Sequence, residues 1–144
     1  MAETRVGESA SRRPNPIVTD DSAVFWDAAS DGRLVAQRCG DCGALRHPPR
    51  PMCPHCHSLK IDVAELSGRG TIYSYAILHH PQHPAFDYPV FAVLVDLDEG
   101  VRVVSNIVGV AKEDIRIGMR VEVEFTSTAG EQKVPVFRPA GDAS

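Results

Sequence analysis

The chain has 144 residues, of which 43% are hydrophobic and 24% are charged, and its formal net charge is −4. This length allows one compact domain or two small ones, and no apolar run approaches the roughly 20 residues of a membrane-spanning helix. The acidic balance argues against nucleic-acid binding as the main task, because such binding normally requires a basic surface. The N-terminus has no apolar export signal, so we expect a cytoplasmic protein without a membrane segment.

Short flexible tails are predicted at residues 1–19 and 141–144. Residues 1–18 combine Glu, Ser, Arg and Pro with almost no apolar side chains. Such a segment cannot bury enough apolar surface to offset the entropy that it loses on ordering. Between the tails we expect three parts: a helix with a lead-in strand over 20–37, a cysteine-containing unit over 38–66 and a barrel over 67–140.

A short helix is the first regular element that the sequence predicts. Residues 20–22, two aspartates and a serine, offer side chains that favour a helix N-cap. The helix should run through Ser30 and stop at Gly32, because glycine readily adopts the left-handed conformation that ends helices. Trp26, the single tryptophan, should pack beneath this helix. Residues 34–38 then form a strand that leads into the first cysteine pair.

All four cysteines lie in two Cys-x-x-Cys pairs, Cys39 with Cys42 and Cys53 with Cys56. Each pair can direct two thiolates at one point, and together they supply the four soft ligands that tetrahedral Zn²⁺ prefers. The spacing therefore predicts a closed, structural zinc ribbon. Iron remains the alternative metal, because four thiolates in a tetrahedron also suit iron.

Other uses of these cysteines fit the sequence less well. Disulfides require an oxidising compartment, which the missing export signal argues against. A thioredoxin-like redox pair needs one Cys-x-x-Cys at a strand-to-helix turn, whereas here a second pair follows in a loop rich in proline. Three histidines flank the pairs, but four thiolates already complete a site; they are His47, His55 and His57.

Charge is distributed unevenly along the chain. Residues 33–60 carry five basic side chains and one acidic side chain, whereas residues 84–131 carry nine acidic and four basic side chains. A basic ribbon could bind an anionic ligand such as a nucleotide phosphate, and the candidates are Arg38, Arg46 and Arg50. The alternative is a basic face that is merely solvated.

After residue 67 the pattern becomes entirely β. Five strands in succession predict a small Greek-key barrel, and a helical turn over 111–115 lies where an OB-fold inserts its helix. The fold class is therefore mainly β, with an N-terminal helix, a zinc ribbon and a five-stranded OB-fold barrel. The strands are expected over residues 71–79, 90–97, 101–110, 121–126 and 134–137.

Two further groups of side chains could take part in function. Tyr73 and Tyr75 alternate with their neighbours, so both should point to one face, where they could stack on a base or fill the barrel. The loop over 79–89 holds His79, His80 and His83 near an aspartate. It could serve as a base or bind a second metal, but it offers no nucleophile with an orienting group, so we assign no catalytic residue and favour contact with a partner.

In this order, the motifs resemble the DUF35 family, the OB-fold acyl-CoA-associated proteins with a rubredoxin-like zinc ribbon. Any one of the motifs would be weak alone, and together they extend over nearly all of residues 20–138. The segments that carry the resemblance are Phe25-Trp26 and residues 37–43, 48–56, 67–75 and 117–121.

The resemblance implies a non-catalytic accessory subunit that complexes with a thiolase-fold enzyme, in a heterotetramer with two copies of each chain. The partner would be a thiolase or retro-aldolase acting on an acyl-CoA, for example in steroid side-chain or aromatic degradation. Coenzyme A or an acyl-CoA would be a shared ligand, for which Arg38, Arg46, Arg50, Tyr73 and Tyr75 are the candidate contacts. The leading helix around Phe25 and Trp26, the ribbon and the histidine loop would contact the partner.

Two other functions stay open at the level of the sequence. A zinc ribbon joined to an OB-fold is also typical of nucleic-acid-binding modules, although an acidic barrel does not provide the continuous basic face that they use. A stand-alone hydrolase that uses the histidine loop would show turnover without any partner.

Overall fold

The computed structural model describes residues 13–140, and helix α2 (Ala23–Ser30) is its first regular element. Ser22 occupies the N-cap position, but its hydroxyl exchanges hydrogen bonds with Thr19 instead of capping the helix. The predicted capping contact is therefore wrong. Gly32 has a φ of +79° and its N–H donates to the carbonyl oxygen of Ala29, so it ends the helix as predicted.

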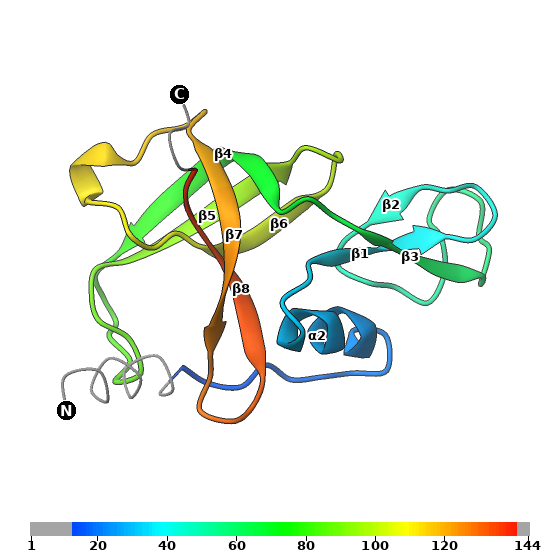
Figure 1. Ribbon diagram of the computed structural model, residues 1–144, viewed down its shortest axis with the longest axis horizontal. Coiled ribbons are helices and arrows are strands. Elements are labelled where there is room, and N and C mark those ends of the chain that lie inside the picture. Colours follow the sequence, from blue (N-terminus) through cyan, green and yellow to red (C-terminus); the bar gives the residue numbers. More distant parts are fainter. Residues whose placement is uncertain (1–12, 141–144) are drawn as a thin grey trace.

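A three-stranded antiparallel sheet carries the cysteine pairs. Its central strand is β1 (Val35–Cys39), between β2 (Leu45–Arg46) and β3 (Ile61–Glu65). The two-residue β2 is absent from the sequence-based prediction because it is too short to show a periodic pattern. This zinc ribbon lies at one end of the molecule, beyond α2 (Figure 1).

Five antiparallel strands form the larger part of the structure. Their order in the sheet is β6-β5-β4-β7-β8, and the turn η1 (Lys112–Asp114) lies between β6 and β7, where the helical turn was predicted. The strands are β4 (Arg69–Leu78), β5 (Val90–Leu97), β6 (Arg102–Asn106), β7 (Arg120–Ser127) and β8 (Lys133–Pro139).

The sheet curls until its two edge strands meet, which makes a nearly closed barrel of the OB type. A parallel bridge joins Ile107 to Phe137, and the Ser105 hydroxyl donates to the carbonyl oxygen of Pro135. The third strand was predicted to continue to residue 110. It ends at Asn106 because the chain then leaves β5 and crosses to β8, where the Val108 N–H donates to the carbonyl oxygen of Phe137.

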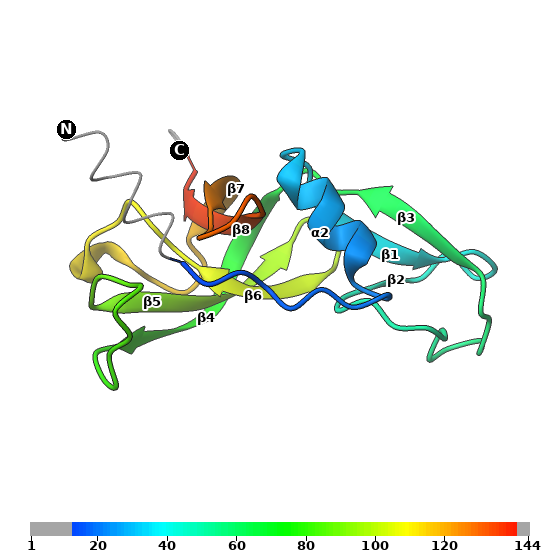
Figure 2. The same cartoon turned by 90° about the horizontal axis from the view of Figure 1, so that it is seen from below.

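The helix, the ribbon and the barrel share one hydrophobic core. Phe25 of α2 and Ala36 of β1 belong to the same buried cluster as barrel residues such as Val95 and Phe137. Figures 1 and 2 show α2 lying between the ribbon and β8. Gly70 is required where β4 approaches β5, because a Cβ there would lie 2.5 Å from the backbone oxygen of Asp96.

The segment before α2 runs along the barrel (Figure 2). The carbonyl oxygen of Arg13 accepts a hydrogen bond of 2.7 Å from the Ala129 N–H, and Asn15 accepts from the Thr128 hydroxyl and the Gly130 N–H. These contacts hold residues 13–15, which the prediction had assigned to the tail. Residues 1–12 of that tail, and the tail at 141–144, lie outside the described residues. Within the described part, no helix has the length and apolar character needed to span a bilayer.

Candidate functional site: a metal centre beside an apolar cleft

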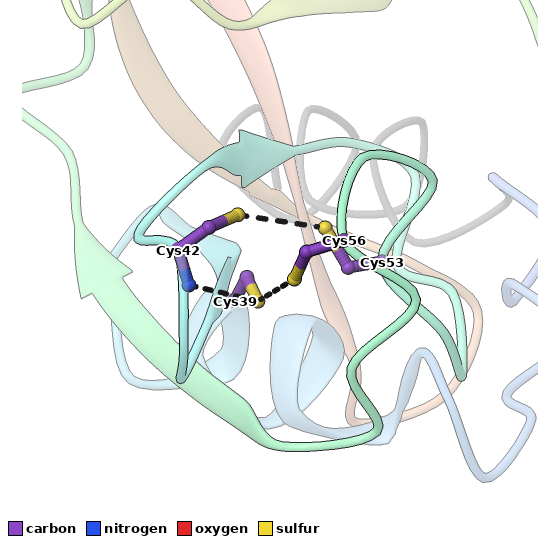
Figure 3. Close-up of side chains that lie close together, drawn as sticks. All are labelled: Cys39, Cys42, Cys53 and Cys56. Carbon is purple, nitrogen blue, oxygen red and sulfur yellow. Dashed lines mark hydrogen bonds between the residues drawn. The ribbon is translucent and has the colours of Figure 1, made fainter.

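The four cysteine sulfurs converge at the tip of the ribbon. Their Sγ atoms all lie within 4.8 Å of one another, and Cys39 faces Cys56 at 3.5 Å while Cys42 faces Cys53 at 3.7 Å (Figure 3). Cys39 ends β1, whereas the second pair comes from the loop that leads to β3. Cys39 and Cys53 are buried and the other two are exposed.

Backbone N–H groups prepare two of these sulfurs, those of Cys39 and Cys53, to act as thiolates. The N–H groups of Cys42 and Asp41 donate to Cys39 Sγ at 3.4 Å, and they lower the pKa of that thiol to about 6. Hydrogen bonds from the N–H groups of Cys56 and His55 likewise lower the pKa of Cys53. Donors that stabilise the charged form favour the thiolate, which is the form that binds metal.

The site fits a zinc ion. Zinc–sulfur bonds of about 2.3 Å in a tetrahedron place the sulfurs about 3.8 Å apart, and the distances of 3.5 Å between Cys39 and Cys56 and 3.7 Å between Cys42 and Cys53 are close to this value. Four thiolates close the coordination shell, so this is a structural zinc ribbon and not a catalytic metal with an open position. His55 and His57 are exposed at the tip of the ribbon, whereas His47 packs against Phe25 with ring centroids 5.0 Å apart.

The three ribbon arginines differ in their surroundings. Arg46 is buried and its Nε donates to the side-chain oxygen of Gln37, while its Nη2 donates to the carbonyl oxygen of Arg50. The same oxygen of Gln37 accepts the Arg50 N–H at 2.8 Å. The Arg46 guanidinium therefore holds the proline-rich loop to β1, and its position is set by the fold.

Much of the basic charge of the ribbon is balanced by acids nearby. Arg38 lies 4.0 Å from Asp62, and Lys60 lies 3.6 Å from Asp41. Arg50 is exposed and forms no ion pair with any residue that the structure describes. It is therefore the most available of the three arginines for an anion.

The two tyrosines do not share a face, which corrects the prediction. A β-bulge between Ile72 and Ser74 shifts the register of β4 against β5. Tyr73 lies on the outer face, where the Arg102 guanidinium stacks 3.6 Å from its ring centroid. Tyr75 pairs with the buried Val93 and so lies on the inner face, although it is itself 37% exposed. Neither tyrosine is buried.

The histidine loop holds no catalytic arrangement among the described residues. His79 and His80 are exposed. The side chain of His83 serves the loop itself, because its Nδ1 accepts a hydrogen bond from the Ala85 N–H. From this loop Phe86 reaches toward the N-terminal segment, where it lies beneath the Arg13 guanidinium at 5.1 Å.

A cleft of about 500 Å³ lies where the N-terminal segment, α2, the ribbon and the barrel meet, and we call it the central cleft. Most of its lining is apolar, including Phe25 and Trp26 of α2, Phe86 of the histidine loop and Phe137 of β8. The rings of Phe25 and Trp26 meet edge to face at 4.8 Å. Concave, apolar sites of this volume are typical of small-molecule binding.

The few polar groups of the central cleft include Arg13, His47 and Asn106. Burial lowers the pKa of His47, so its imidazole is neutral at pH 7. The Arg13 guanidinium donates to the side-chain oxygen of Asn106 at 3.0 Å. No acidic side chain lines the cleft among the described residues.

Sequence reasoning found part of this cleft and missed the rest. Phe25 and Trp26 were singled out for contact with a partner, but Phe25 is buried and only Trp26 is partly exposed. Arg13 was assigned to the tail and Asn106 to the middle of a strand. A possible signal was the run Pro14-Asn15-Pro16, which is stiff and precedes two apolar residues.

Two family models match adjacent parts of the chain. The model described as the rubredoxin-like zinc ribbon domain of ChsH2 matches residues 26–62, and the model of the C-terminal OB-fold domain of ChsH2 matches residues 63–126. Together they extend over the ribbon and most of the barrel, in the order in which the structure presents these two units.

Two relatives and one solved structure add to this match. The chain is 49% identical to a probable enoyl-CoA hydratase alpha subunit of Thermomonospora curvata, across 89% of this chain but only 40% of that protein. It is 30% identical to the benzoylsuccinyl-CoA thiolase subunit BbsA of Geobacter metallireducens, across 76% of this chain and 75% of that protein. The solved structure is described as the Ltp2-ChsH2(DUF35) aldolase, and one of its chains superposes with a TM-score of 0.84 at 48% identity, covering 87% of this chain and 98% of that chain.

Proposed function

The chain belongs to the DUF35 family, whose members join a ChsH2-type zinc ribbon to an OB-fold, and from this premise we propose that it is an accessory subunit of a thiolase-type enzyme that acts on an acyl-CoA. The observation that carries the proposal is the likeness to the DUF35 chain of the aldolase, which extends over almost the whole of that chain. The thiolase subunit among the relatives supports the same kind of partner.

The chemistry of the chain is consistent with a non-catalytic role. All four cysteines point into the metal site, so none is available as the nucleophile that a thiolase requires. Among residues 13–140, the histidine loop brings no hydroxyl or thiol nucleophile against an imidazole. The partner would therefore supply the reacting groups, and this chain would supply binding surface.

The chain would help to complete the acyl-CoA site of its partner. The central cleft is the part of the structure suited to an acyl group, because it is concave and largely apolar. The nucleotide end of coenzyme A would lie toward the ribbon. There Arg50 is exposed and forms no ion pair with a described residue, so it could bind a phosphate. Arg38 could also bind a phosphate if its ion pair with Asp62 opened. Tyr73 and Tyr75 are both exposed enough to stack on adenine, but they lie on different faces, so only one of them would contact a given adenine.

Co-expression with a thiolase-like enzyme encoded beside this chain tests the proposal. The two chains should purify together, and the enzyme should lose activity, solubility or substrate preference when it is produced alone. The variant Cys53→Ser, in which the ribbon should unfold, tests whether the ribbon is needed for the complex, and it should no longer purify with the enzyme. Failure to purify together, combined with equal turnover of acyl-CoA by the enzyme alone, would refute the accessory role.

A further inference from the structure

We infer that Arg13 is a specificity-determining residue of the central cleft and selects ligands that combine a compact apolar group with a carboxylate. For acyl-CoA ligands this means an acyl group that carries a ring or short branched chain and a second, free carboxylate. The assignment to an acyl-CoA rests on the proposed function, whereas the preference for a carboxylate rests on the contacts of the cleft itself.

The position of the guanidinium is set by two contacts within the cleft. Nη1 of Arg13 donates to the Asn106 side-chain oxygen at 3.0 Å, and the Phe86 ring lies under the guanidinium at 5.1 Å. The backbone of the same residue is tied to Ala129. These contacts engage one edge and one face of the guanidinium, and other N–H donors remain for a ligand, because an arginine has five.

Among residues 13–140, the charge of Arg13 has no counter-charge in the cleft. Arg13 forms no ion pair with any of these residues, and those that line the cleft include no acid. Burial lowers the pKa of Arg13, but an arginine side chain stays protonated at neutral pH. A partly desolvated cation of this kind attracts an anion more strongly than an exposed cation does, since water screens it less.

The shape of the guanidinium and of the cleft narrows the ligand class. A planar guanidinium matches the two oxygens of a carboxylate, so a carboxylate can accept two parallel hydrogen bonds. Other parts of the cleft lining are aromatic and aliphatic, and they include Trp26, Pro48 and Pro49. A volume of about 500 Å³ admits a ring with a short chain. A carboxylate on a compact apolar group satisfies both parts of the site, whereas a flat partner surface would leave the concave part empty.

Trp26 provides a direct readout, because it is the single tryptophan and it lines the cleft. The test titrates the full chain with 4-phenylbutyrate and with 4-phenyl-1-butanol, which differ only in the charged end, and follows tryptophan emission. Both probes should change the emission, and the carboxylate should bind about tenfold more tightly than the alcohol, as expected for hydrogen bonds to a charged group.

Arg13→Gln should weaken binding of the carboxylate about tenfold and leave binding of the alcohol unchanged. Arg13→Lys should retain part of the preference, because it keeps the charge without the planar fork. Arg116→Gln removes an exposed arginine outside the cleft and should change neither affinity. Circular dichroism of each variant confirms that it is folded.

Equal affinity of the wild-type protein for the two probes would overturn the inference, as would equal weakening of both by Arg13→Gln. An unchanged tryptophan emission at millimolar 4-phenylbutyrate would also overturn the inference. In that case the group that pairs with Arg13 would be an acidic side chain of a partner protein. This titration uses the chain without a partner. If the chain and the thiolase-like enzyme failed to purify together, the proposed function would fail but the inference about Arg13 would not.

Discussion

At the scale of single residues, one glutamine organises the interior of the ribbon. The side-chain oxygen of Gln37 accepts from both Arg46 and the Arg50 backbone, and Gln37 and Arg46 are both buried. Each buried donor that loses its acceptor lowers the free energy of unfolding by about 1–3 kcal/mol, and by more when the donor is charged. The polar contact of Gln37 thus contributes to the stability of the proline-rich loop.

Gln37→Ala should lower the free energy of unfolding by about 2–4 kcal/mol, because it leaves donors of Arg46 and Arg50 without an acceptor. Arg38→Ala is the matched control on the next residue of β1, and it should change stability by less than about 1 kcal/mol, since its contact with Asp62 is exposed. Chemical denaturation measures both. Equal effects of the two variants would show that Gln37 has no special role.

The surface ion pair between Asp98 and Arg120 makes the stability of the fold depend on pH in the acid range. Hydrogen bonds from Arg120, with its charge and that of Arg69, lower the pKa of Asp98 in the folded chain. The folded pKa therefore lies below the unfolded value of about 3.9, so the pair stabilises the fold above this pH and the contribution is lost as the pH falls through the folded pKa.

Asp98→Asn should be less stable than the wild type at pH 6, and the difference should vanish as the pH falls toward about 2. Asp27→Asn, on the exposed part of α2, is the control and should follow the wild-type profile. Thermal denaturation at several pH values provides the comparison. A difference that stays constant with pH would contradict the role assigned to the Asp98–Arg120 pair.

At the scale of elements, the ribbon depends on its metal more than the barrel does. The strands β1 to β3 are short and one of them has only two residues, so the sheet alone provides few contacts. The barrel has five strands and most of the buried core. Metal binding and folding are coupled in small metal domains of this kind.

Cys53→Ser, or removal of the metal with a chelator, should unfold residues 33–60 and leave the barrel folded. Elemental analysis should find one zinc per wild-type chain, and hydrogen exchange should show loss of protection confined to the ribbon. Ser58→Ala, which removes an exposed hydroxyl of the same loop that bonds to Asp41, is the control and should keep its zinc. Iron in the purified protein, or a folded protein without metal, would contradict the zinc assignment.

At the scale of the whole molecule, α2 joins the two β units. Phe25 is buried in the core that includes barrel residues, and its ring also contacts His47 of the ribbon. Gln132, which precedes β8, donates to the carbonyl oxygen of Trp26. The two units therefore form one body with α2 between them, and the central cleft opens along this junction.

Phe25→Ala should lower the free energy of unfolding by about 3–5 kcal/mol and disturb the emission of Trp26, because the cavity left behind lies between the two units. The neighbouring Val24→Ala is the control, since Val24 is 39% exposed and its loss should cost less than about 1 kcal/mol. Denaturation followed by tryptophan emission measures both effects.

The complex with a thiolase-like enzyme should contain two copies of each chain, because thiolase folds usually dimerise and each protomer would bind one accessory chain. Light scattering coupled to size-exclusion chromatography measures the mass. A complex of one chain with one enzyme protomer would contradict this stoichiometry while leaving the accessory role intact.

The sequence alone determined the features that depend on local spacing. The two Cys-x-x-Cys pairs specify a metal site because each pair is a short turn, and the nearly continuous apolar run of residues 90–97 specifies a strand with the observed bounds. Only the tertiary structure decided the rest. The central cleft joins side chains as far apart as Arg13 and Phe137, the burial of Arg46 depends on the loop folded over it, and a single bulge separates the faces of Tyr73 and Tyr75. Contacts between distant segments and shifts of strand register leave no periodic trace in the residues that make them, so only the folded chain shows them.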